Sequence, residues 1–422
     1  MERGIISAAK HPKFQKLPLK KMKAKPQFYQ SPHIQSFWTT GNGRDLLEWS
    51  GAKPDIAKFD RYSHLYHEVD ALGDAAVQET YLKLPYHEAS ALVEKYSASP
   101  VSADEVAPEN LKKLFLQMQE VPGWFNADLA NAGARFCMRT GTNGLIILRD
   151  FTLMGGYDFA FLNKPLVFTG ALKRGAVKRL KDTLEFWVNV TRENALRTNS
   201  EAYRLIVRTR LLHSYARLKI RQKSEDWDYA NWGTPINMWD MVATYTGFSL
   251  VFMQGLRKLG IRISEEEEKG VFHLWKYIGY LLGIPAKYML DNKEEAVEQF
   301  YLWTATQGAG DNDSAYLAKA LLDENLESTI LRYHFQRKNL RYLHICCNWY
   351  LLDENINERL QIPKVPLPHV FPSVIKSANV LTQKIFPLHK PESYRKLVDM
   401  GHKQQMKVLS DYLRHTPKDF HY

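Results

Sequence analysis

The sequence predicts a mainly α-helical protein, a single large domain in which strands are nearly absent. Apolar residues recur at helical spacing along most of the chain. Glycines and prolines fall where these helices would start or stop. Only GLIILRD, around Ile146–Leu148, carries the β-branched run of a short strand. At 422 residues, 45% of them hydrophobic, the chain is long enough to bury a sizeable core.

The chain divides into three parts. Residues 1–70 form a basic, extended N-terminal arm and lead-in, because helical periodicity begins only near Asp74. Residues 71–360 form the helical main domain. Residues 361–422 hold a Pro-rich turn, PKVPLPHVFPS, and a C-terminal helical extension that packs on that domain.

Several helices can be placed individually. One is broken by Pro85, and the next begins near Pro108, where the missing N–H costs little. FNADLANAGARFCMRTG forms a further helix. MWDMVATYTGFSLVFMQGLRKLG and GVFHLWKYIGYLLG each end at a glycine suited to a C-cap, Gly260 and Gly283, and Ser264 is the expected N-cap of the second.

The charge and the cysteine content of the chain limit its expected cellular location and its expected binding partners. The formal charge of +11 suggests nucleic acid or an acidic membrane. Seven lysines and one arginine, however, lie in residues 1–25, an arm that either solubilises the chain or touches an anionic surface. We see no secretory signal and no run of 18 apolar residues. Cys137, Cys346 and Cys347 fit neither a disulfide framework nor a zinc site. We expect a cytoplasmic protein, peripheral membrane contact through the arm being the alternative, and no nucleic-acid partner.

His213 lies within VRTRLLHSYARLKIRQ, surrounded by leucines and arginines. On a helix it is in line with Ile206 and Ile220, so its ring points towards the apolar face or its edge. Arg210 and Arg217 share its flank. One interpretation is a buried imidazole hydrogen-bonded to a carbonyl, and the other is an axial haem ligand. Zinc is disfavoured, because we cannot assemble the further ligands it needs.

A second candidate site lies on the preceding helix, in the run Arg179-Leu180-Lys181-Asp182-Thr183. Arg179 and Thr183 are one turn apart and share a face beside an apolar stripe. They would suit a pocket wall that holds the anionic edge of a cofactor and a small polar ligand. In the structural alternative, Arg179 caps a neighbouring carbonyl and Thr183 bonds back to its own helix.

The order of these segments resembles the latex-clearing protein, or rubber oxygenase, family, which includes fungal oxygenases that cleave prenyl chains. The resemblance rests on VPGWFN, the Arg179-x-x-x-Thr183 helix, RTRLLHSYAR, PINMWDMVATYTGFS and LWKYIGYLLGIP, and covers roughly residues 105–300. It implies a globin-like helical core, enlarged by additional helices, that binds haem b. It also implies O2-dependent cleavage of a C=C bond in an isoprenoid chain.

Carried over residue by residue, the resemblance makes His213 the proximal ligand of the haem iron. Arg179 and Thr183 would line the haem pocket from the other helix. Arg210 and Arg217 would support the ligand helix or the haem propionates.

Two departures from the family pattern concern the substrate. Rubber-cleaving members place a lysine directly before the pocket threonine, where this chain has Asp182. That carboxylate is either a distal base or a group that pairs with Arg179 or Lys178. Those members also carry a glutamate in the preceding segment, whereas FLNKPLVF here has none.

We therefore expect a haem b-dependent oxygenase of an apolar substrate of isoprenoid or terpenoid type, with Thr183, Asp182 and Arg179 at the reacting side. The rivals are a haem peroxidase or peroxygenase, a non-catalytic haem-binding or gas-sensing protein, and a helical scaffold whose basic surface binds nucleic acid or acidic membrane. The sequence does not determine the oligomeric state.

Overall fold

The computed structural model describes residues 23–170 and 176–415. The N-terminal third comprises α1 (Pro32–Thr39), α2 (Asn42–Ser50), η2 (Ile56–Arg61), η3 (Ser63–Tyr66), α3 (Ala71–Glu79), α4 (Tyr86–Ala98), α5 (Glu109–Gln119) and α6 (Ala127–Arg139). The middle comprises α7 (Gly141–Ile147), η4 (Leu148–Leu153), α8 (Met154–Gly156), α9 (Ala160–Phe168), α10 (Ala176–Val190), α11 (Glu201–Lys223), α12 (Tyr229–Trp232), α13 (Met238–Thr246), η6 (Gly247–Val251) and α14 (Phe252–Lys258). The last part comprises α15 (Glu265–Leu281), η7 (Ala286–Tyr288), α16 (Lys293–Thr304), α17 (Asn312–Glu327), α18 (His334–Leu351), α19 (Glu354–Arg359), α20 (Val370–Ile385) and α21 (Pro391–His415).

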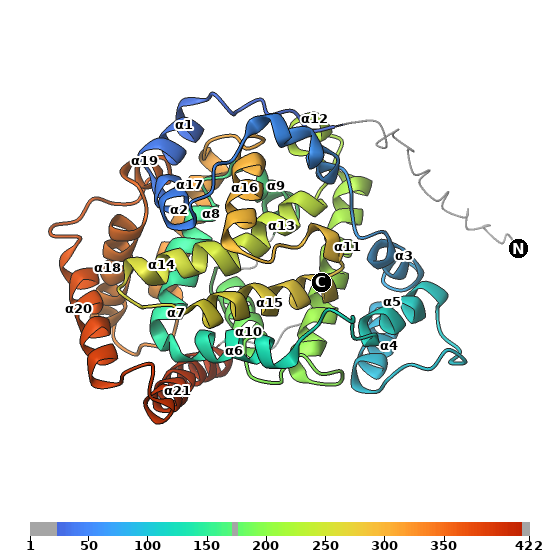
Figure 1. Ribbon diagram of the computed structural model, residues 1–422. Coiled ribbons are helices and arrows are strands. Elements are labelled where there is room, and N and C mark those ends of the chain that lie inside the picture. Colours follow the sequence, from blue (N-terminus) through green and yellow to red (C-terminus); the bar gives the residue numbers. More distant parts are fainter. Residues whose placement is uncertain (1–22, 171–175, 416–422) are drawn as a thin grey trace, which may run out of the picture.

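The predicted mainly α class is confirmed, since the β pairing found in the described ranges is one isolated bridge between Phe159 and Ala309. Figure 1 shows α3, α4 and α5 at one end of the molecule and α18, α20 and α21 at the other. Between them α6 and α15 pack so closely that a Cβ on Gly133 or Gly270 would strike the backbone of the other helix. This contact fixes α15, whose C-terminal end reaches the candidate site.

The lead-in to the main domain is helical, and the expected extended segment is wrong for residues 32–66. Ile34, Trp38 and Leu46 are buried, and the Trp38 indole donates to Thr304 Oγ1 at 2.9 Å. Helices α1 and α2 are only eight and nine residues long, too short for their periodicity to stand out among the surrounding aromatics. The basic arm itself lies mostly within residues 1–22, outside the described residues. The boundaries at 70 and 360 stay predictions.

The short strand expected around Ile146–Leu148 is also wrong, because this segment passes from α7 into the π-helical turn η4. Ile147 is fully buried and packs, with Phe151, against Gly255 of α14. Close packing against a neighbouring helix therefore overrides the strand preference of the β-branched residues.

The predicted helix ends are confirmed. α4 begins directly after Pro85, and Ser264 caps α15 through a reciprocal capping box with Glu267. Gly260 and Gly283 end their helices with φ of 77° and 91°. In the described part of the chain, no helix combines the length and apolar character needed to cross a bilayer.

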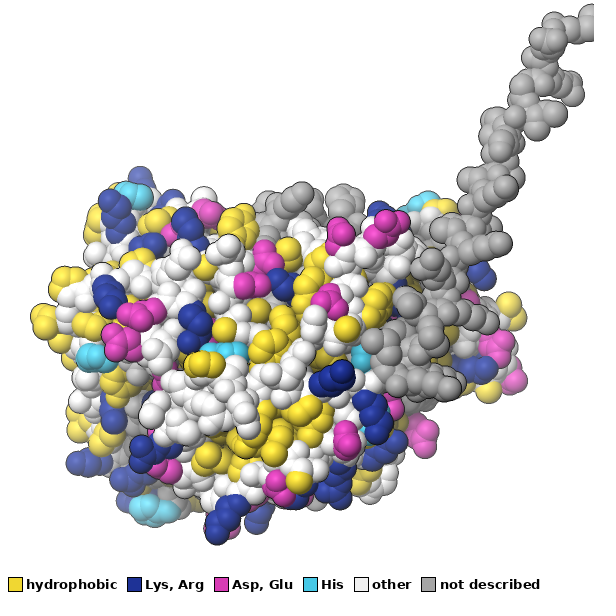
Figure 2. Space-filling model, turned by 90° about the horizontal axis from the view of Figure 1, so that it is seen from above, with side chains coloured by type: hydrophobic (Ala, Val, Ile, Leu, Met, Phe, Trp, Pro, Cys, Tyr) yellow, Lys and Arg dark blue, Asp and Glu magenta, His cyan; other side chains and the backbone are white. Residues whose placement is uncertain are grey.

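The excess of positive charge is not concentrated on the face seen in Figure 2. Lysine and arginine side chains are interspersed there with aspartate and glutamate, and hydrophobic side chains gather between them. Such mixing does not resemble the continuous basic stripe of a nucleic-acid-binding surface.

Candidate functional site

The candidate site is a small cavity against α11 whose volume is about 10 Å³. His213, Arg210 and Arg217 all face it, as their helical spacing predicted. The other walls come from segments far apart in the sequence: Asp70, Ile236, Met238, Met241 and Leu282. The site therefore combines one imidazole and two guanidinium groups with apolar side chains.

Arg210 is held by a carboxylate at the start of α3. Its Nε donates to Asp70 Oδ2 at 2.7 Å, and Nη2 donates to Asp70 Oδ1 and Gln117 Oε1, both at 3.0 Å. Burial would raise the pKa of Asp70, but the Arg210 guanidinium and the Gly73 N–H outweigh it and hold the pKa below its usual value. Gly283 fits beside this pair with φ of 91°, and a Cβ there would meet both side chains.

Arg217 is held one turn further along α3. Its Nε and Nη2 donate to Asp74 Oδ1 at 2.9 and 2.6 Å, and Nη2 also reaches Ser214 Oγ at 3.0 Å. Its Nη1 donates to the Ile236 carbonyl at 2.9 Å. The Asp70 and Asp74 carboxylates thus fasten the histidine-bearing helix on both sides of His213.

Ile236, on the cavity wall, adopts a strained backbone. Its φ is 52°, a left-handed value that a β-branched residue rarely takes. Its carbonyl is fixed by Arg217, so the ion pair on α11 also holds this strained residue in place. Strain of this kind tends to collect at ligand sites.

His213 carries the least satisfied polar atom of the cavity. Its Nδ1 is buried and has no hydrogen-bond partner. Burial first, and the nearby Arg217 charge second, lower the pKa of His213 to about 4, although Asp70 acts in the opposite direction. The imidazole is therefore neutral at pH 7, which is the form that binds a metal.

This shift predicts acid destabilisation of the cofactor-free protein. Since the pKa is about 6.5 in the unfolded chain and about 4 in the folded one, the unfolded state binds the proton first. The free energy of unfolding should fall from pH 6.5 towards pH 4, by about 3 kcal/mol in all. Urea unfolding across this range measures the effect.

The control is His213→Gln, which should lack this component. The comparison is needed because burial raises the pKa of Asp240 to about 7, which adds stability as the pH falls through the same range. If the wild type and the variant lose stability in parallel, the imidazole is not the cause.

The residues predicted on α10 are not brought to this cavity. The guanidinium carbon of Arg179 lies 5.4 Å from the ring centre of Tyr157, and Thr183 Oγ1 donates to the Arg179 carbonyl at 3.1 Å. The side chain of Asp182 is 52% exposed and pairs with Lys181 at 2.8 Å. Helix α10 packs against α11, but none of the three is among the described residues that line the His213 cavity.

Several buried charges were missed by the sequence reasoning. Asp70 and Asp74 lie 140 and 143 positions from their arginines, and no local pattern marks them. Lys181 is buried and pairs with Asp182 and with Glu185, the latter at 3.4 Å. The sequence offered only an indirect signal for these carboxylates. An arginine on the apolar side of a helix becomes buried, and a buried guanidinium group needs a carboxylate partner.

A second buried charge network links the C-terminal helices to η4. His344 Nδ1 lies 2.6 Å from Asp150 Oδ2, and Arg149 Nη1 donates to Asp150 Oδ1 at 2.9 Å. Glu324 accepts from Tyr412 at 2.8 Å and lies 3.5 Å from Arg149. These contacts join α17, α18 and α21 to the middle of the chain, so we interpret the network as structural.

The chemistry of the donor fits a haem ligand. A neutral imidazole with a buried, unpartnered nitrogen stands on a long helix between two paired arginines. A cavity of about 10 Å³ holds only a water-sized group, so a porphyrin requires its apolar walls to separate. Met238 and Met241 are adaptable side chains of the kind that permits this.

Comparison with known proteins adds a family. The model described as "ER-bound oxygenase mpaB/B'/Rubber oxygenase, catalytic domain" matches residues 147–371, more than half of the chain. A search of the curated proteins found no match. Among solved structures, latex clearing protein in the closed state is similar, with a TM-score of 0.63 and 15% identity over 81% of this chain and 91% of that one. At this identity the likeness is one of fold.

Proposed function

Because the chain belongs to the mpaB/rubber oxygenase family and is therefore an oxygenase, we propose that it uses haem b and O2 to cleave a C=C bond in an apolar isoprenoid or terpenoid substrate. When bound, haem b would supply the iron at which dioxygen is activated. The observation that carries the proposal is the unpartnered, buried Nδ1 of neutral His213 on the wall of the cavity.

In this proposal His213 is the axial ligand of the iron. Arg210 and Arg217 orient its helix, because their guanidinium groups are already occupied by Asp70 and Asp74. This favours support of the helix over pairing with propionates. Met238, Met241 and Leu282 line the cavity beside the imidazole, and their apolar surface suits a hydrocarbon substrate.

Arg179, Thr183 and Asp182 remain proposed residues of the opposite wall. Asp182 is the least suited of the three, because it faces solvent and pairs with Lys181. This weakens the peroxidase alternative, which needs a buried acid–base group on the distal side. The Arg179 guanidinium lies against the ring of buried Tyr157, which follows α8, so a ligand beside this part of α10 would meet both polar groups.

An absorption spectrum of the purified, haem-supplied protein tests the cofactor, and turnover with O2 tests the reaction. We expect a Soret band and consumption of O2 with carbonyl products from an isoprenoid hydrocarbon. Turnover with hydrogen peroxide alone would establish a peroxygenase instead. A six-coordinate spectrum without turnover would establish a haem-binding or gas-sensing protein. A colourless protein would support the alternative of a helical scaffold without a cofactor.

A further inference from the structure

The outer face of α20 is an apolar surface that lies largely open. Among the described residues it touches other elements at its edges, where the Phe371 ring lies edge-on with its centre 6.1 Å from that of the Tyr342 ring and Val380 lies beside Gly260. Pro372 is the one buried residue of this sixteen-residue helix. The outward positions follow the spacing of a helical stripe, and each is between 37% and 74% exposed: Leu367, Val370, Phe371, Val374, Leu381 and Ile385 at 48% or more, with Val380 beside them at 37%. Figure 1 shows α20 at the outer edge of the molecule.

The inner face of α20 combines the apolar contacts of Pro372 and Ile375 with polar contacts. Asn379 Nδ2 donates to the Leu259 carbonyl at 2.9 Å. Gln383 Nε2 donates to the Gly260 carbonyl at 2.9 Å, and its Oε1 accepts from the Arg262 N–H at 2.8 Å. These bonds fix the rotation of the helix about its axis, so the apolar stripe cannot turn inwards.

The segment that carries the stripe contains basic side chains and no acidic ones. From residue 359 to residue 391 the sequence has no aspartate or glutamate, and Lys376 and Lys384 lie on α20 itself, whereas Lys364 pairs with Glu358 at 3.0 Å. A stripe of apolar side chains flanked by lysines is the pattern of helices that lie in the headgroup region of an anionic membrane. Acidic side chains around the stripe would instead have been repelled by the anionic lipid headgroups.

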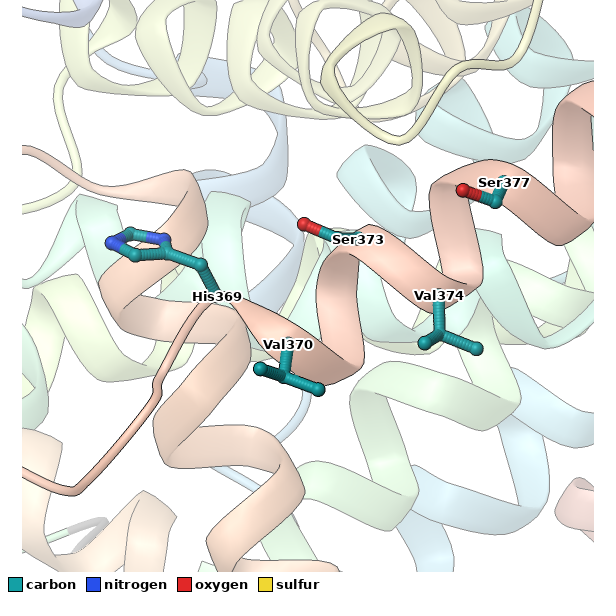
Figure 3. A pocket seen from close by; sticks show the side chains of 5 residues that line it. All are labelled: His369, Val370, Ser373, Val374 and Ser377. Carbon is teal, nitrogen blue, oxygen red and sulfur yellow. The ribbon is translucent and has the colours of Figure 1, made fainter.

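The shape of this surface favours a bilayer over a peptide or helix partner. The hollow beside the stripe is open and shallow, about 450 Å³ in volume, and is lined by His369, Val370, Ser373, Val374 and Ser377. Figure 3 shows Val370 and Val374 on one side of α20 and Ser373 and Ser377 on the other. The apolar and polar side chains are thus separated on this helix, as they are in helices that lie at a membrane–water boundary.

We propose that α20 docks parallel to the surface of an anionic lipid bilayer, with the apolar side chains of Val374, Leu381 and Ile385 inserted among the acyl chains. The helix is sixteen residues long, so it lies on the membrane and does not span it. This inference depends on neither the cofactor nor the reaction proposed above.

Co-sedimentation of the full chain with vesicles tests the proposal. We expect binding to phosphatidylcholine vesicles that contain phosphatidylserine, and at least a tenfold loss of binding in the Leu381→Asp, Ile385→Asp double variant. The matched control is Tyr316→Asp on α17, whose side chain is as exposed (60%), and it should bind like the wild type. All variants should keep the thermal unfolding of the wild type, because these side chains are exposed.

Charge is tested separately. Lys376→Gln with Lys384→Gln should weaken binding to the anionic vesicles while the basic N-terminal segment stays intact. Equal binding by the wild type and the Leu381→Asp, Ile385→Asp variant would overturn the proposal. So would a wild-type protein that ignores vesicles but forms a dimer that the same variant abolishes, because the stripe would then be an interface between two copies.

Discussion

A His213→Ala variant is expected to fold but to retain no haem. The imidazole is the candidate axial ligand, and its Nδ1 is buried without a partner, so the apoprotein loses no hydrogen bond when it is removed. The alanine leaves a somewhat larger cavity, but it also removes an unsatisfied polar atom, and these two effects oppose each other. We expect the free energy of unfolding of the apoprotein to change by no more than about 1 kcal/mol.

The measurement is the Soret absorbance per polypeptide after haem loading and gel filtration, together with circular dichroism. Imidazole added to the His213→Ala protein should restore part of the band, because the vacated space opens onto the same site. A matched control is His273→Ala on α15. His273 Nε2 accepts from the Asn126 N–H at 2.8 Å and its ring stacks on Phe125, so it has a structural role.

That control should retain haem even if it is less stable. A normal Soret band in the His213→Ala protein would remove the haem ligand proposed here, and with it the proposed reaction. The family assignment would stand, because it rests on the match over residues 147–371 and not on this side chain.

The periodicity of the sequence predicted the orientation of α11 well. His213, Arg210 and Arg217 face one cavity, as their spacing along a helix requires. What the sequence could not provide was the opposite wall. Asp70 and Asp74 meet α11 only because α3 packs on it, and a contact across some 140 residues leaves no trace in local periodicity.

The errors of the sequence-based prediction have physical causes of the same kind. Ile146–Leu148 has the composition of a strand, but Gly255 leaves room for Ile147 to pack as part of a helix. The roles inferred for Arg179 and Thr183 came from a family resemblance and stay predictions. In the structure Thr183 bonds back to α10 and Arg179 lies against Tyr157. A motif identifies a residue, but it does not show which other elements pack against that residue's face of the helix.

Removing the Asp74 carboxylate is expected to destabilise the protein by about 3–5 kcal/mol. Arg217 is only 2% exposed, so Asp74→Asn leaves a buried guanidinium group without the charge that compensates it. The same change should weaken haem binding, because Arg217 holds both α11 and the strained Ile236 at the cavity. Urea unfolding of the apoprotein and haem titration measure the two effects.

A more exposed ion pair between α4 and α11 provides the control. Glu94 accepts from Arg208 at 2.8 Å, but the two side chains are 50% and 32% exposed, so Glu94→Gln should cost less than about 1 kcal/mol and leave haem binding unchanged. The double variant Asp74→Asn, Arg217→Met should regain part of the lost stability, since no unpaired charge is then buried. If Asp74→Asn costs no more than Glu94→Gln, then α3 does not hold the histidine helix, and the positioning of His213 must be sought in the packing of α11 against α10, α4 and α15.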